Sequence, residues 1–212
     1  MTEEEWLTCE DPRWLLEHLR KQARSRKLRL FACACVRRVW RRIPNPVCRQ
    51  ALEVAEQYAD REVKNATRQQ AHRAARALCR PGVSASVSLA SFVTHGPRYT
   101  HVDASGAAQR AIFAITGKPA AKVAERATQA EVCRDIFGNP FRPVTLNPAW
   151  RTSNVTALAQ AIYDERAFDR LPILADALED AGCDNGDILN HCRQPGEHVR
   201  GCWVVDMILG KE

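Results

Sequence analysis

The sequence lacks a run of apolar residues long enough to cross a bilayer. Arginines interrupt its longest apolar stretch, Leu28–Trp40, whereas a spanning helix needs about 20 apolar residues. A phosphate-binding loop is also lacking, because Gly117 and Lys118 have no glycine at the required spacing before them and a proline after them. No dinucleotide-binding fingerprint occurs, and the whole chain has only 10 glycines. These absences argue against a membrane protein, a nucleotide-driven machine and a dinucleotide-dependent enzyme.

An export signal is lacking as well. The segment Met1–Trp6 is acidic, whereas a secretory signal is basic and then apolar. The nine cysteines are an odd number, and nothing in the sequence places them in an oxidising compartment. We therefore expect reduced thiols and a cytoplasmic protein. With 45% hydrophobic and 26% charged residues, the composition is typical of one substantial globular domain or two small ones.

Helical periodicity dominates the first 80 residues. The pairs Asp11-Pro12 and Asn45-Pro46 each place a capping acceptor before a proline, which is typical of a helix start. Between these starts, a helix from Ser25 carries one apolar stripe formed by Leu28, Phe31, Ala32, Cys35, Val36, Val39 and Ile43. A fourth helix is predicted over residues 64–79.

The second half of the chain repeats this pattern around a proline-rich segment. Helices are predicted over 107–115 and 120–137, and three more after caps at Ser153, Asp169 and Asp184, the second of them stopped by Gly182. Prolines 140, 143 and 148 make the intervening segment extended, covering its own core or docking on a partner. The sequence therefore predicts a mainly α fold, a helical bundle or stacked helical hairpins, with an extended Pro-rich segment near 138–150.

Turn-forming residues suggest a division of the chain. Pro81 and Gly82 end the helical pattern, and residues 81–104 are rich in serine and turn formers. We predict a linker or mobile insertion there, between an N-terminal helical region, 1–80, and a C-terminal helical region, 105–212. The alternative is that the two regions form one continuous domain.

Several segments resemble a large paralogous family of uncharacterised bacterial proteins. These are Arg134–Val144 (RDIFGNPFRPV), Ala159–Gly182 (AQAIYDERAFDRLPILADALEDAG), Arg26–Trp40 (RKLRLFACACVRRVW) and the C-terminal block HCRQPGEHVRGCWVVD. The resemblance covers most of the chain outside residues 65–130 and implies an intact bacterial domain. It implies no activity, substrate or cofactor, and it assigns no functional residue.

Positive charge is concentrated in residues 20–42, which contain ten Lys and Arg residues and no acidic residue. The ten are Arg20, Lys21, Arg24, Arg26, Lys27, Arg29, Arg37, Arg38, Arg41 and Arg42. Such a segment can follow a phosphate backbone, which makes nucleic acid a candidate partner. The alternative is pairing with the six acidic residues of 1–19, or with a partner protein.

A cluster of metal-ligand side chains lies near the C-terminus and consists of Cys183, His191, Cys192, His198 and Cys202. Zinc accepts three or four such ligands in a tetrahedron. However, no Cys-x-x-Cys occurs, and adjacent His191 and Cys192 point apart on a helix, so the alternative is buried cysteines with surface histidines. The same residue types suit a cysteine hydrolase, but no nucleophile elbow or glycine-rich loop supports that reading.

No catalytic arrangement in the sequence has a specific motif. We therefore predict a non-enzymatic helical interaction module that binds another protein and needs no cofactor. Two alternatives stay open: a nucleic-acid-associated protein that uses residues 20–42, and a small zinc-binding protein or enzyme that uses residues 183–202.

Overall fold

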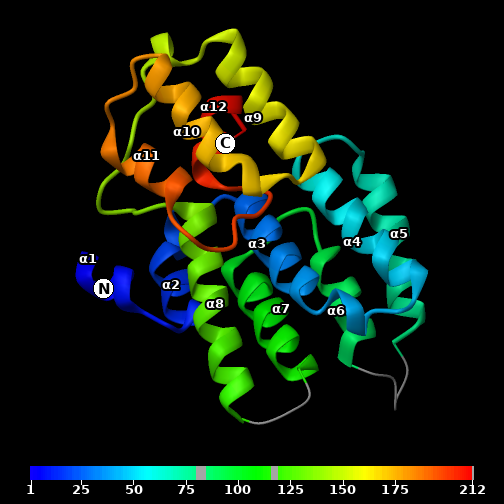
Figure 1. The fold of residues 1–212 in the computed structure, drawn as a ribbon. Coiled ribbons are helices and arrows are strands. Elements are labelled where there is room, and N and C mark those ends of the chain that lie inside the picture. The colour runs from blue at the N-terminus through cyan, green and yellow to red at the C-terminus, as the bar shows by residue number, and fades with distance from the viewer. Residues whose placement is uncertain (80–84, 116–118, 212) are drawn as a thin grey trace. The chain divides into compact units, whose positions relative to one another are not determined.

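A computed structural model describes residues 1–79, 85–115 and 119–211 of the chain. Over these ranges it contains twelve α-helices and no β-strand, which confirms the predicted mainly α fold (Figure 1). The helices divide into two compact units, Met1–Cys133 (unit 1) and Arg134–Glu212 (unit 2). No helix in the described ranges is both long and apolar enough to span a membrane.

Unit 1 is built around one central helix. Its helices are α1 (Glu3–Thr8), α2 (Pro12–His18), α3 (Ser25–Arg38), α4 (Pro46–Ala59), α5 (Asn65–Ala77), α6 (Ala85–Val93), α7 (His101–Ala114) and most of α8 (Pro119–Phe137), with short 3-10 turns η1 (Leu19–Lys21) and η2 (Trp40–Arg42). The central helix α3 packs against α4, α6 and α7. As a result every residue from Leu28 to Val36 is buried. The helix is therefore buried on all sides along this stretch, and not only along the predicted apolar stripe.

Two of the predicted helix starts are confirmed in unit 1. The side chain of Asp11 accepts a hydrogen bond from the backbone N–H of Arg13, and that of Asn45 accepts one from Val47. Each acceptor satisfies an amide that has no partner within the helix, and the proline that follows needs none.

Residues 85–104 contain α6 and the start of α7, within the stretch predicted as a linker or insertion. Leu89, Ala90 and Val93 of α6 are fully buried, because α6 packs against α4, α5 and α7. Residues 81–84 of the predicted linker lie outside the described residues. The boundary between the two units falls within α8, after Cys133, and not at residues 81–104.

Two buried arginines hold the C-terminal end of α6. The guanidinium of Arg29 donates hydrogen bonds to the carbonyl oxygens of Val93, His95 and Gly96, at 2.5, 3.0 and 2.6 Å. Arg68 donates to the carbonyl oxygen of Thr94. These carbonyls have no partner within a helix that ends here, so the arginines satisfy them and favour the negative end of the helix dipole.

Unit 2 surrounds its own apolar core. It contains the end of α8 and the elements η3 (Pro148–Trp150), α9 (Ser153–Glu165), η4 (Phe168–Arg170), α10 (Leu171–Asp180), α11 (Gly186–Arg193) and α12 (Trp203–Leu209). Helix α9 packs on α10 and α12, and α10 packs on α11. From the extended segment, Val144, Leu146 and Trp150 pack against this core. The Pro-rich segment therefore covers its own unit.

Helix starts in unit 2 lie within a few residues of the predicted ones. Thr152 caps α9 in place of Ser153, and Asn185 caps α11 in place of Asp184. The predicted cap at Asp169 is wrong, because this residue lies inside η4 and α10 begins two residues later. Gly182 follows the end of α10 at φ +84°, as predicted for a residue that stops a helix.

Candidate metal centre

Four side chains of unit 2 meet at one point: Asp135, His191, His198 and Cys202. One ligand atom of each lies within 4.8 Å of the ligand atoms of the other three. In a tetrahedral zinc site with metal–ligand distances of about 2.0–2.3 Å, neighbouring ligand atoms are about 3.3–3.7 Å apart. The four side chains are therefore spaced closely enough to share one ion.

Asp135 is placed by the last turn of α8. Gly138 follows at φ +68° and donates its backbone N–H to the carbonyl oxygen of Arg134 at 2.9 Å, which ends the helix. A Cβ at Gly138 would lie 3.3 Å from Cγ of Trp203, the first residue of α12. The glycine thus allows both the left-handed backbone and the close approach of the indole ring.

Replacement of Gly138 by alanine should destabilise the protein by more than the same change at Gly182. Alanine at a positive φ costs about 1–2 kcal/mol. Gly182 carries this cost alone, since no atom lies within 4 Å of its added Cβ, whereas at Gly138 the indole of Trp203 must also move. Urea denaturation of the two variants measures the difference, and equal midpoints would refute a role for the contact with Trp203.

The other three ligands come from α11 and the segment that follows it. His191 lies on the buried side of α11, His198 lies in the connection to α12, and Cys202 immediately precedes α12. Gly201, at φ +100°, turns the chain before Cys202. The ligands His191, His198 and Cys202 thus belong to one short stretch, and Asp135 is brought to them by the fold.

Two atoms of the cluster each contact two other members. Oδ1 of Asp135 is 2.6 Å from Nδ1 of His198 and 3.1 Å from Nε2 of His191. That same Nε2 is 3.2 Å from Sγ of Cys202. A ring nitrogen carries at most one hydrogen, so an Nε2–H that donates to the carboxylate leaves no second hydrogen for the sulfur. A central cation, by contrast, accepts an electron pair from every member of the group.

The same distances argue against a cysteine hydrolase. In a nucleophile–base–acid relay, the base contacts its two partners through opposite ring nitrogens. Here Cys202 and Asp135 both face Nε2 of His191, while its Nδ1 faces the side-chain amide of Gln194 at 3.2 Å. Cys202 also has no exposed surface, so a substrate cannot reach its sulfur.

Burial and charge act on the cluster in opposite directions. Burial alone would raise the pKa of Asp135, but the hydrogen bonds and charges of His191 and His198 outweigh it and lower that pKa. Burial, with the negative charge of Asp135 added, raises the pKa of Cys202 well above its ordinary value. Backbone N–H groups of Val205 and Val204 act in the opposite sense on Cys202. A dication beside the sulfur would favour the thiolate.

Three of the five predicted ligands belong to this cluster, and two do not. His191, His198 and Cys202 converge, whereas Cys183 and Cys192 lie in the apolar core of unit 2. Burial raises the pKa of Cys192 to about 12. Cys192 is adjacent to His191 on α11, but it is not among the four side chains whose ligand atoms converge. The side chains that could share one ion are therefore Asp135, His191, His198 and Cys202, and Cys183 and Cys192 are not among them.

The predicted basic segment does not form one open face within unit 1. Arg26 pairs with Asp60, Arg37 with Glu56, Arg38 with Glu125 and Arg20 with Glu17, at 2.8, 2.6, 2.9 and 3.2 Å. Arg29 is buried and Lys27 is half-buried, which leaves Lys21, Arg24, Arg41 and Arg42 exposed along with Arg20. Much of the positive charge is therefore neutralised within the unit.

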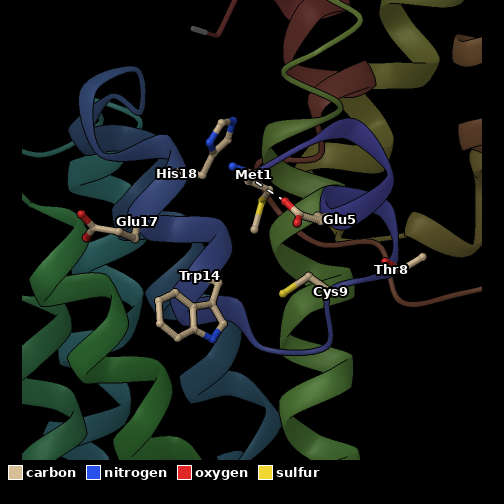
Figure 2. A pocket seen from close by; sticks show the side chains of 7 residues that line it. All are labelled: Met1, Glu5, Thr8, Cys9, Trp14, Glu17 and His18. Carbon is tan, nitrogen blue, oxygen red and sulfur yellow. Dashed lines mark ion pairs between the residues drawn. The ribbon is translucent and has the colours of Figure 1, made fainter.

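Unit 1 also has an open cavity of about 580 Å³ beside α1 and α2. It is lined by Met1, Glu5, Thr8, Cys9, Trp14, Glu17 and His18 (Figure 2). The Trp14 side chain is 63% exposed, and the ion pair drawn there joins the amino group of Met1 to Glu5 at 3.8 Å. These side chains do not converge on a common point, and we assign no function to the cavity.

Comparisons with known proteins found no matching family model, no similar curated protein and no similar solved structure.

Proposed function

We propose that this protein binds one zinc ion per chain through Asp135, His191, His198 and Cys202, and that the ion stabilises unit 2. The observation that carries the proposal is the convergence of a carboxylate, two imidazoles and a thiol within 4.8 Å at a buried position. Buried polar groups need partners, and a shared ion would supply one partner to all four side chains.

The chemistry of the ligands favours zinc. Thiolate and imidazole suit zinc and its neighbours in the transition series, whereas calcium and magnesium prefer oxygen ligands. Four protein ligands fill a tetrahedron and leave no position for a substrate, which is typical of a structural site. The proposal therefore includes no catalytic activity.

Groups around the ligands support the same interpretation. The backbone N–H of Val199 donates to Oδ2 of Asp135 at 2.9 Å and leaves Oδ1 directed at the histidines. Gln194 contacts Nδ1 of His191, and the Trp203 ring lies 5.0 Å from the His191 ring. Outer groups of this kind orient metal ligands and select the histidine tautomer.

Metal content and a cobalt spectrum test the proposal. Elemental analysis of protein purified without added metal should find about one zinc per chain. After exchange into cobalt(II), a tetrahedral site with one thiolate should give visible d–d bands and a sulfur-to-cobalt band in the near ultraviolet.

Two cysteine variants make this test specific. Cys202→Ser should lose the sulfur-to-cobalt band, while Cys192→Ala, which removes a neighbouring buried thiol outside the ligand set, should keep it. This ligand set would be refuted if the purified protein contained no metal and also took up no cobalt. It would also be refuted if the sulfur-to-cobalt band disappeared in Cys192→Ala and persisted in Cys202→Ser.

A further inference from the structure

Unit 1 contains a second basic region, which has no acidic residue at all. Between Glu62 and Asp103 the sequence has six Lys and Arg residues and neither Asp nor Glu. Helix α5 lies within this stretch and packs on α4 and α6 (Figure 1). Whereas Arg26, Arg37 and Arg38 of α3 have acidic partners, no carboxylate on α5 itself can neutralise its charge.

The side of α5 that faces away from α4 and α6 presents polar and cationic side chains to solvent. Gln69, Gln70, Arg73 and Arg76 are exposed, and so is Lys64, which directly precedes the helix. Arg68 and Ala75 are the buried residues of the helix. Neither Arg73 nor Arg76 forms an ion pair with any residue that the structure describes.

Several basic side chains lie near His72 on α5. Burial lowers the pKa of His72, and the charges of His95, Arg68 and Arg76 act in the same direction, while the hydrogen bond between its ring and the carbonyl oxygen of Ser91 acts in the opposite one. His95 lies close by, with its ring centroid 5.9 Å from that of His72. Clustered basic side chains on a surface attract anions.

The composition of this face argues for a polyanion and against the other common partners. Besides the cationic and amide side chains, its exposed residues include Ala66, Ala74 and Ala77. It lacks the large apolar side chains with which an amphipathic helix enters a membrane. It also lacks the aromatic anchors that dominate the centre of protein–protein interfaces.

We propose that the outer face of α5, formed by Gln69, Gln70, Arg73 and Arg76, is a docking surface for nucleic acid. The cationic groups would neutralise backbone phosphates, and the glutamine amides can hydrogen-bond to base edges. Exposed alanines allow the strand to approach closely.

This proposal differs from the nucleic-acid hypothesis based on residues 20–42 and is independent of the metal ligands. It places binding at arginines that form no ion pair with the part of the chain that the structure describes. The two regions are therefore distinguished by a pair of matched charge reversals, one on α5 and one at Lys21 and Arg24, which are exposed residues of the 20–42 segment.

Binding of the full chain to a fluorescein-labelled 20-base-pair DNA of mixed sequence tests the surface by fluorescence anisotropy. We expect R73E/R76E to weaken binding by on the order of 10-fold or more at 50 mM NaCl, and K21E/R24E, with the same change in net charge, to weaken it less than about 3-fold. In R73A/R76A the slope of log K against log salt should become shallower by about 1.8, because two phosphate contacts are lost.

The proposal fails if the wild type binds neither this duplex nor a single-stranded RNA of the same length at 50 mM NaCl. It also fails if the two charge reversals have equal effects, or if vesicles containing 30% phosphatidylserine bind the protein more tightly than nucleic acid does. Circular dichroism of each variant, in which only exposed side chains change, verifies that α5 is still folded.

Discussion

Removal of zinc by a strong chelator should destabilise unit 2 and leave unit 1 largely unchanged. A ligand that binds only the folded state stabilises it by about 4 kcal/mol when its free concentration is 1,000 times its dissociation constant. Since three of the four ligands lie between His191 and Cys202, amides of α11 and α12 should exchange faster without the ion. Hydrogen exchange of the full chain with mass spectrometry measures this, with α3 as the internal reference.

Cysteine variants provide the control for this result. In Cys202→Ser the chelator should have little further effect, because one of the four ligands is already absent. In Cys192→Ala, which loses core packing but no ligand, the chelator should still accelerate exchange in α11 and α12. Exchange in the wild type that is the same with chelator as with zinc would contradict a stabilising ion.

Replacement of Arg29 by methionine should destabilise unit 1 by about 3–5 kcal/mol. Burial lowers the pKa of Arg29, and the guanidinium is held by three carbonyl oxygens and by the rings of Tyr58 and Tyr99, whose centroids are 5.3 and 4.4 Å from its central carbon. Methionine fills much of the volume but donates no hydrogen bond, so the end of α6 loses its partners. Urea denaturation measures the loss.

The exposed Arg24 provides a matched control on the same segment. Arg24→Met makes the identical chemical change at a residue of the exposed class just before α3, where substitutions usually alter stability by less than about 0.5 kcal/mol. Similar midpoints for the two variants would show that the contacts of Arg29 with α6 do not stabilise the unit.

The fold was largely predictable because periodicity and caps are local properties. Asp11 and Asn45 act as caps through side chains that reach only two residues ahead. The extent of burial on α3 was not predictable in this way. Periodicity indicates one buried face, but three helices surround α3 and bury even Arg29.

The candidate site was predictable only in part, for a similar reason. His191, His198 and Cys202 are close in sequence, so residue type and spacing were enough to suggest them. Asp135 lies more than fifty residues earlier, on the buried side of α8, and no local pattern joins it to the histidines. In the same way, Arg37 and Arg38 are neutralised by Glu56 and Glu125 of other helices, and the charge count of one segment cannot reveal such partners.

The order of the ligands along the chain has a topological consequence for unit 2. An ion held by both Asp135 and Cys202 ties together the two ends of a polypeptide loop of roughly 65 residues, and this loop includes most of the unit. By the chain-entropy estimate used for covalent cross-links, closing a loop of this size restricts the unfolded chain by about 4 kcal/mol at room temperature. Zinc would thus act as a reversible cross-link that depends on metal supply and not on an oxidising environment.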